Sequence, residues 1–508
     1  MRNHRFKIIS CLVMACIILT GVSCKKYINE RPISSTYDSK FWTSQQSVEQ
    51  AVVALYGQLR SCLRQDASYF AFGDLPAGQF ATTYNSYWNY NTIQPSQGSD
   101  FSYVPYLEGS LKNWTRFYQL AAQCNLILAR VPSMSLSAFK NDSAVRNGYL
   151  GEALFMRAYL YFYITRVWGD PVYITKIYDN VDYGNIPPVA RTPEGDVLKA
   201  CIADLQQAVG YLSFSDGDPG KAFRANKGNV YALLAHIYAW LHDYPNAHQA
   251  CQQVIAQGGY ALEPMDSYSN IWSEDLSVEN IFSIAMTFNS NDNNFLNAGD
   301  NSAWSEAHYD FFSVWLKDSS IDYRNSNCWV ANPTLYADSD RRFVTMFHAV
   351  DASGGDDPGY ELLKYAHFKY NNPASKQQPY INSNLVLFRL SDIYLLDAEA
   401  QAVQGDLGNA VLSLNHTRER AGIGDYSGPL TGEDILQDIL DERGRELIGE
   451  GTWFYDLIRM EPYVHNLRDV LGYTQTRVAE KGYYWPIDLN TLFQGDPLLT
   501  QNPYWSSH

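Results

Sequence analysis

The residues best suited to ligand chemistry in this chain form a short run of alternating rings and amides. Residues 84–91 read YNSYWNYN, and the side chains of interest are Tyr84, Tyr87, Trp88, Asn89, Tyr90 and Asn91. Flat aromatic rings pack against the C–H faces of sugars, while amides hydrogen-bond to sugar hydroxyls. Such rings also anchor loops onto a core, and for any single ring the two interpretations carry equal weight. For the run as a whole, we expect at least one ring to contact a ligand.

A second set of aromatic residues lies in the polar stretch between residues 301 and 329. Its members are Trp304, Tyr309, Trp315, Tyr323 and Trp329. Trp315 sits in the apolar run FFSVWL, which is typical of a protein core. We therefore predict that Trp304, Tyr309 and Trp329 form a second wall of the ligand site. They are weaker candidates than the run at 84–91.

Four carboxylates near the C-terminus share a stretch with helical spacing and suggest an acid–base pair. They are Asp441, Glu442, Glu446 and Glu450. Arg443 and Arg445 are interleaved with them, and a catalytic pair would need surroundings that separate the two carboxyl pKa values. We instead expect Glu442 and Glu446 to form a structural ion-pair network with Arg443 and Arg459. The sequence also lacks the GxSxG, HExxH, P-loop and GxGxxG motifs, so we expect no enzyme activity.

Metal and redox chemistry find little support in the sequence. The Asp-rich stretch at 351–357 and the pair Asp216 and Asp218 lack the ligand order and the closing Glu of an EF-hand. Solvated acidic loops explain them better than a structural calcium site, and we expect no cofactor. Five cysteines follow residue 24 without CxxC or Cys/His metal spacing, so we expect them to be buried as small apolar residues. They are Cys62, Cys124, Cys201, Cys251 and Cys328.

The N-terminus has the pattern of a secretion signal. A basic start is followed by an apolar stretch at 8–19 that is too short to span a bilayer as a stable anchor. Gly-Val-Ser-Cys then ends at Cys24 and resembles a bacterial lipobox, with Gly21 where Leu is more usual. We expect residues 1–23 to be removed and Cys24 to carry a lipid that tethers the chain to a membrane. An ordinary signal peptide cut nearby is the alternative.

Length and charge narrow the class of protein further. The chain has 508 residues, 46% of them hydrophobic, and can bury a large core. Its 38 Lys and Arg stand against 54 Asp and Glu, a formal net charge of −16. Such an acidic chain is poorly suited to bind nucleic acid or an anionic membrane surface.

The elements that must position these residues are mainly helices. Apolar residues at steps of three and four predict helices over 47–63, 112–131, 145–168, 192–211 and 229–257. The stretch 388–459 begins with a helical hairpin, in which Ile393, Leu396, Ala400 and Val403 share a face and Gly405-Asp406 forms the turn. The large–small–turn–small pattern of a tetratricopeptide unit occurs at 229–257 and 394–417, but not in tandem. We therefore predict a mostly all-α fold.

Between the helices, two segments have no helical period. Residues 70–101 predict a long ordered loop, rich in Gly, Pro, Ser and Asn. Residues 280–383 are irregular, and short apolar runs such as 281–286 within them suit strands. The tail at 483–505 contains several Pro residues, and we expect it to wrap the core. We predict one domain over 24–508, with a helical core at about 45–260 and 385–460, an irregular insertion at about 262–384 and a wrapping tail at 461–508.

Several ordered motifs resemble the SusD/RagB family of Gram-negative nutrient-uptake lipoproteins along nearly the whole mature length. The most specific are FRLSDIYLLDAEA, LNHTRERAG and DERGRELIGEGTWFYDLIR, within 388–459. Similar motifs are FWTSQQSVEQAVVALYGQLR near the start, RVWGDPVY at 166–173, Ser339-Asp340-Arg341-Arg342, and WPIDLNTLFQGDPLLTQNPYW in the tail. So many matches in the same order identify the chain as a member of that family.

The resemblance implies a SusD-like fold with four tetratricopeptide-like units and an irregular half that carries the ligand site. It implies an outer-membrane surface lipoprotein that acts as a lid on a SusC-like TonB-dependent β-barrel transporter and binds an oligosaccharide without hydrolysing it. By region, the family's glycan site corresponds here to Asp74, residues 84–91 and part of 301–329. Lys25-Lys26 departs from the family because acidic residues do not follow it closely.

Two other functions remain open from the sequence. One is a peptide or protein-fragment receptor of the same transporter type, which would use sheet edges or a broad polar cavity instead of stacking rings. The other is a periplasmic helical-repeat scaffold or a glycoside hydrolase with a helical core. The run YNSYWNYN favours a glycan over a peptide. The lipobox and the missing catalytic motifs weigh against the periplasmic scaffold and the glycoside hydrolase.

Overall fold

The computed structural model describes most of the chain between residues 41 and 507. The described residues are 41–65, 68–82, 101, 111–177, 187–273, 276–285, 329–331, 336–350, 359–365, 368–372, 374–375, 377–381, 383–488, 492 and 497–507. Cys24, the predicted signal at 1–23 and Cys328 lie outside them. Cys62, Cys124, Cys201 and Cys251 are buried and free, as expected for small apolar residues.

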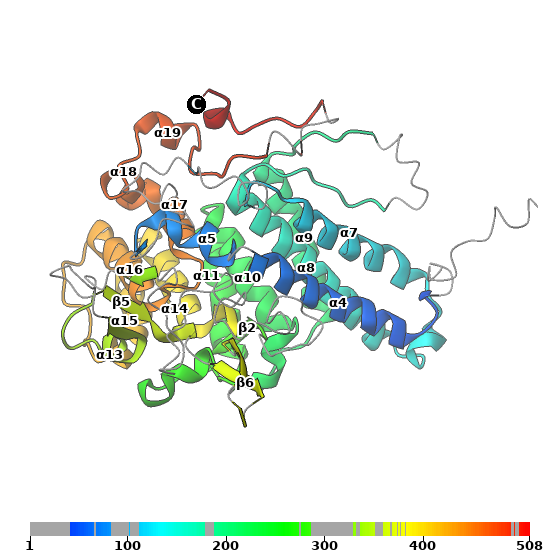
Figure 1. Ribbon diagram of the computed structural model, residues 1–508, viewed down its shortest axis with the longest axis horizontal. Helices are drawn as coiled ribbons and strands as arrows, with labels where there is room; N and C mark the ends of the chain where they lie inside the picture. Colours follow the sequence, from blue (N-terminus) through cyan, green and yellow to red (C-terminus); the bar gives the residue numbers. More distant parts are fainter. Residues whose placement is uncertain are drawn as a thin grey trace, which may run out of the picture.

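Helices form most of the described structure (Figure 1), which confirms the mostly all-α prediction. The long ones are α4 (Gln45–Arg64), α7 (Thr115–Arg130), α8 (Ser143–Trp168), α9 (Glu194–Tyr211), α10 (Lys227–Trp240), α11 (Tyr244–Gln257), α14 (Leu390–Val403), α15 (Leu407–Ala421), α16 (Gly432–Glu446) and α17 (Trp453–Val464). Their closest partners are α8 with α9, α10 with α11 and α14 with α15, and α11 also packs against α14. Among the described helices, none is both long and apolar enough to cross a membrane.

Short helices connect the long ones. They are α5 (Ser68–Gly73), α13 (Arg341–Met346), α18 (Asn466–Asp469), α19 (Gln475–Ala479) and α20 (Pro503–Ser507), with 3-10 turns η2 (Leu75–Ala77), η5 (Val131–Ser133), η6 (Leu136–Phe139), η7 (Pro219–Phe223), η8 (Met265–Ile271) and η11 (Leu363–Tyr365). The start of the predicted loop at 70–101 is therefore helical, and that part of the prediction was wrong. Phe70 and Phe72 are buried, and their contacts with the core favour a compact helix over a loop.

The two tetratricopeptide-like hairpins, α10–α11 and α14–α15, are built by the same local chemistry. Asp243 caps α11 by accepting from the backbone N–H of Asn246, and its second oxygen accepts from the Asn246 side chain at 2.7 Å. Asp406 caps α15 in the same way, with Asn409 as partner at 2.8 Å. Each cap satisfies a helix N–H that would otherwise lack a partner. The motif Asp-x-x-Asn-Ala therefore starts the second helix of both hairpins.

The predicted core face of the 388–417 hairpin is confirmed. Ile393, Leu396 and Ala400 are fully buried, and the small residues Ala398 and Ala410 have no exposed surface either. α8 is buried on nearly all sides, so it runs through the core rather than over it. α9 begins at Glu194, two residues after the predicted start, and the Glu194 N–H donates to Asp170 Oδ1 at 2.8 Å.

Strands occupy part of the stretch expected to be irregular. β2 (Asn280–Ile284) pairs antiparallel with β8 (Leu385–Arg389), which confirms a strand in the apolar run at 281–286. A second sheet has the order β1-β3-β5-β4, from β1 (Phe80–Thr82), β3 (Trp329–Ala331), β4 (Phe347–Val350) and β5 (Gly359–Leu362). β6 (Phe368–Asn372) pairs with β7 (Gln377–Ile381).

The described part of the C-terminal tail lies against the helical core. Trp485 is 1% exposed, its backbone N–H donates to the Val167 carbonyl at 2.8 Å, and its ring meets that of Phe72 edge-on at 4.9 Å. Asn502 donates back to the Trp485 carbonyl at 2.9 Å. Gly169, with φ of 75°, ends α8 and lies against Tyr484. The tail thus closes the C-terminal end of α8.

Candidate functional site

The structure pairs the two strands that border the predicted aromatic stretches. β1 ends at Thr82, two residues before Tyr84, and Thr82 lies directly opposite Trp329 in the antiparallel pair β1–β3. The last residue of β1 and the first residue of β3 therefore lie side by side at one end of the strand pair. Sequence spacing could not show this, because 247 positions separate the two residues.

Most of the predicted ligand-contacting side chains lie outside the described residues. They are Tyr84, Tyr87, Trp88, Asn89, Tyr90, Asn91, Trp304 and Tyr309. Trp329 is placed by its backbone at the start of β3. The candidate site is accordingly defined by the strand pair that supports it, with β5 and β4 continuing the same sheet.

Asp74 is the exception, because the structure gives it a different role from the one predicted. Its side chain is fully buried, and its two oxygens accept from the backbone N–H groups of Gly451 at 2.8 Å and Trp453 at 3.3 Å. Burial raises the pKa of Asp74 to about 7, although the two backbone donors oppose the rise. A carboxyl group held in this way cannot face a ligand. It fixes the turn before β1 to the start of α17, and so positions the strand that leads to Tyr84.

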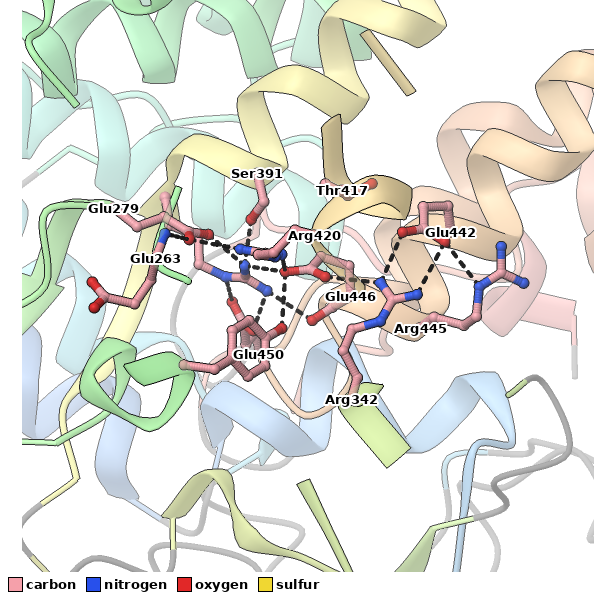
Figure 2. Close-up of polar contacts among 12 residues, drawn as sticks. Glu263, Glu279, Arg342, Ser391, Thr417, Arg420, Glu442, Arg445, Glu446 and Glu450 are labelled. Atoms are coloured by element: carbon pink, nitrogen blue, oxygen red, sulfur yellow. Dashed lines mark hydrogen bonds and ion pairs between the residues drawn. The ribbon is translucent and has the colours of Figure 1, made fainter. Parts of the chain in front are cut away.

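A buried network of charges lies between α13, β8 and α16 (Figure 2). Arg342, from α13, donates to Glu442 and Glu446 of α16, each at 2.8 Å. Arg389, at the end of β8, donates to Glu450 at 2.9 Å and to Glu279 at 2.8 Å. The network therefore ties the irregular region and the strand β8 to one helix, α16, and to the turn that follows it.

The predicted ion-pair network exists, but its partners differ from those expected. Glu446 is contacted by Arg342, Arg389 and Arg420, none of them close in sequence. Arg443 and Arg459 belong to a second row of charges, whose acidic members are Asp392, Asp456 and Glu399. The prediction failed in detail because spacing along one helix does not reveal which distant arginines enter the core.

The electrostatics of this network favour support over catalysis. Burial alone would raise the pKa of Glu446, but Arg420, Arg389 and Arg342 together hold it well below its usual range. The pKa of Glu442 is likewise lowered by Arg342 and Arg445 against the effect of burial. Both carboxylates therefore stay ionised and saturated with donors. Burial raises the pKa of Asp441, whose oxygen accepts from Gln437 at 2.9 Å instead of pairing with a second carboxylate.

The described residues contain no group of three or more His, Cys, Asp or Glu side chains arranged to hold a metal. Asp218 accepts from the backbone of Gly220 at 3.0 Å and starts η7, so that oxygen serves the turn. The acidic stretch at 351–357 lies outside the described residues.

The chain is similar to proteins and structures described as SusD-like. A family model described as "SusD family" matches residues 351–505, and one described as "Starch-binding associating with outer membrane" matches residues 26–239. SusD-like protein P38 of Formosa agariphila is 25% identical over 544 residues, covering 98% of this chain and 100% of that protein.

Two further matches come from Bacteroides thetaiotaomicron. The starch-binding protein SusD is 29% identical over 146 residues, which cover 28% of this chain and 25% of that protein. The crystal structure of a SusD homolog superposes with a TM-score of 0.71 at 25% identity, covering 92% of this chain and 99% of that one. The likeness in fold therefore extends over nearly the whole chain.

Proposed function

This chain belongs to the SusD/RagB family, and on that premise we propose that it binds an oligosaccharide at the bacterial cell surface and passes it to a transporter. The partner would be a SusC-like TonB-dependent β-barrel of the outer membrane, which this protein would cap. Members of the family are binding proteins, and the matched description couples starch binding to the outer membrane. A lid held beside its transporter works at high effective concentration, so modest affinity for the glycan suffices.

The observation that carries the proposal is the pairing of Thr82 with Trp329. It gives the aromatic run at 84–91 and the second aromatic stretch a common origin on one sheet. Two aromatic walls that start side by side can face the two sides of one sugar chain. Residues far apart in the sequence would then act as one glycan site, consistent with a family whose matched description is starch binding.

Attachment to the membrane is the second part of the proposal. Cys24 follows an apolar segment and would carry the lipid that keeps the protein at the outer membrane. Replacing Cys24 by Ala should move the protein from the membrane fraction to the soluble fraction of cells. The transporter-bound pool should fall with it. A variant that stays in the membrane fraction to the same extent would contradict lipidation at this residue.

Replacing Trp88 and Tyr87 by Ala tests the glycan site. The mature chain and the variants are titrated with a panel of soluble polysaccharides and peptides by calorimetry, and their melting temperatures are compared. We expect the double variant to lose at least tenfold in affinity for the bound glycan without a change in melting temperature. Tyr426→Ala, outside both aromatic stretches, is the matched control and should bind normally. An unchanged affinity in the double variant, or preferential binding of peptides, would overturn the assignment.

A further inference from the structure

Three neighbouring helices enclose a groove, and none of its lining residues belongs to a described strand. α7, α8 and α9 pack side by side (Figure 1), and the groove between them has a volume of about 470 Å³. This volume lies in the range of about 300–1,000 Å³ that small-molecule sites have in proteins. The lining begins at Asn125 on α7 and includes Gln207 and Tyr211 on α9.

The floor of the groove is a stripe along α8. Arg146, Leu150, Leu154 and Arg157 follow one another at steps of four, four and three, so they occupy one face of the helix. The two leucines between the arginines are only 6% and 4% exposed, so the accessible apolar surface comes mainly from Leu128 and Pro132 in the same lining. Such a surface suits the C–H face of a sugar ring, while the arginines at its ends suit polar or charged substituents.

The two arginines are in different electrostatic states. Arg157 donates twice to Asp204, at 2.8 Å each, and once to Asn125 at 3.0 Å, so its charge is offset and its position fixed. The Arg146 side chain has no hydrogen bond or ion pair within the described part of the chain, and its Nε is shielded from solvent without a partner. The Arg146 side chain is partly exposed, so its guanidinium can reach a ligand in the groove. Among the described residues, the groove therefore holds one arginine, Arg146, without an ionic partner.

The remaining polar groups suit hydroxyls better than a second charge. Gln207 donates from its amide to the Tyr211 hydroxyl at 3.0 Å. This arrangement leaves the Tyr211 proton and the Gln207 carbonyl oxygen to meet a ligand. A planar guanidinium binds a carboxylate with two parallel hydrogen bonds. The groove thus combines a carboxylate receptor, hydroxyl-bonding groups and an apolar surface.

From this combination we propose that the α7–α9 groove is a second ligand site, and that it binds a sugar carrying a carboxylate, such as a uronic acid. Arg146 binds the carboxylate, Gln207 and Tyr211 meet the hydroxyls, and Leu128 and Pro132 face the ring. The site uses residues between 125 and 211, away from the strand pair at Thr82 and Trp329. This second site does not depend on glycan binding by residues 84–91.

The test uses the mature full chain and small defined ligands. D-Glucuronate and D-galacturonate are compared with D-glucose, D-galactose and acetate by ligand-detected NMR and calorimetry. We expect both uronates to bind at least tenfold more tightly than the neutral sugars and than acetate. Equal binding of a uronate and its neutral sugar would overturn the role of the carboxylate. Equal binding of acetate and the uronates would overturn the role of the sugar.

Variants place the binding in the groove. Arg146→Gln should weaken uronate binding at least tenfold, whereas Lys199→Gln, which removes an exposed charge from α9, should leave it unchanged. Gln207→Trp, at an exposed position, should block the groove without disturbing the core. Trp88→Ala should leave the part of uronate binding that depends on Arg146 unchanged, which separates this site from the proposed glycan site. Normal uronate binding by folded Arg146→Gln and Gln207→Trp would overturn the proposal.

Discussion

Replacing Arg342 by Met tests how much the buried charge network stabilises the fold. Arg342 has no exposed surface and contacts three carboxylates, those of Asp340, Glu442 and Glu446. Met fills much of the arginine volume but removes the charge. Breaking a buried ion pair by removing one partner costs about 3–5 kcal/mol, because the remaining charge stays buried. We expect the free energy of unfolding to fall by that amount.

The contacts also show where the cost arises. After the change, Glu446 keeps Arg389 and Arg420, and Glu442 keeps Arg445. Asp340 keeps the backbone N–H at position 342, but its charge then has no cationic partner among the described residues. Adding Asp340→Asn should therefore recover part of the loss, since Asn also caps α13 well. This double variant should be more stable than Arg342→Met alone.

The neighbouring residue provides a matched control. Arg341 pairs with Asp266, but their side chains are 52% and 91% exposed. Exposed ion pairs contribute about 0–1 kcal/mol, so Arg341→Met should change little. Urea unfolding followed by circular dichroism compares the variants at neutral pH. A loss below about 1 kcal/mol for Arg342→Met, or an equal loss for Arg341→Met, would refute the reasoning.

Three further changes test other parts of the fold. Gly73→Ala should destabilise the protein strongly, because a Cβ at this position would lie 2.0 Å from the Gly451 carbonyl oxygen. Gly57→Ala, with open space around the new Cβ, should instead stabilise α4 by about 0.5–1 kcal/mol. Thermal melts compare the two variants. The pKa of Asp74 in the folded protein is raised to about 7, so between about pH 4 and 7 only the unfolded state releases this proton. The free energy of unfolding should therefore fall by about 4 kcal/mol as the pH rises through this window, and it should level off above it. Asp74→Asn should flatten that part of a melting-temperature profile, and a slope identical to the parent's would contradict the assignment. Asp406→Ala should cost about 1 kcal/mol in chemical unfolding through loss of the α15 cap, and no loss would show that the cap is dispensable.

What local sequence determines in this protein is the set of helices and their buried faces. The steps of three and four that place Ile393, Leu396 and Ala400 on one face depend only on helix geometry, so the order of residues is enough to predict that face. The turn at Gly405-Asp406 is likewise local, because the cap uses neighbouring backbone. The family resemblance rests on motifs of this kind, and the matched family models agree with it.

Tertiary structure alone decides which polar residues meet. Arg341 and Arg342 are adjacent and chemically identical, yet one is exposed and the other lies fully buried against Glu442, 100 positions away. Asp74 is a second example, because its carboxylate accepts hydrogen bonds from the backbone N–H groups of Gly451 and Trp453 and does not face a ligand. The pairing of Thr82 with Trp329 and the groove at Arg146 also join segments that no local period connects. Helix periodicity arises within a few residues, whereas contacts of this kind depend on how distant segments pack.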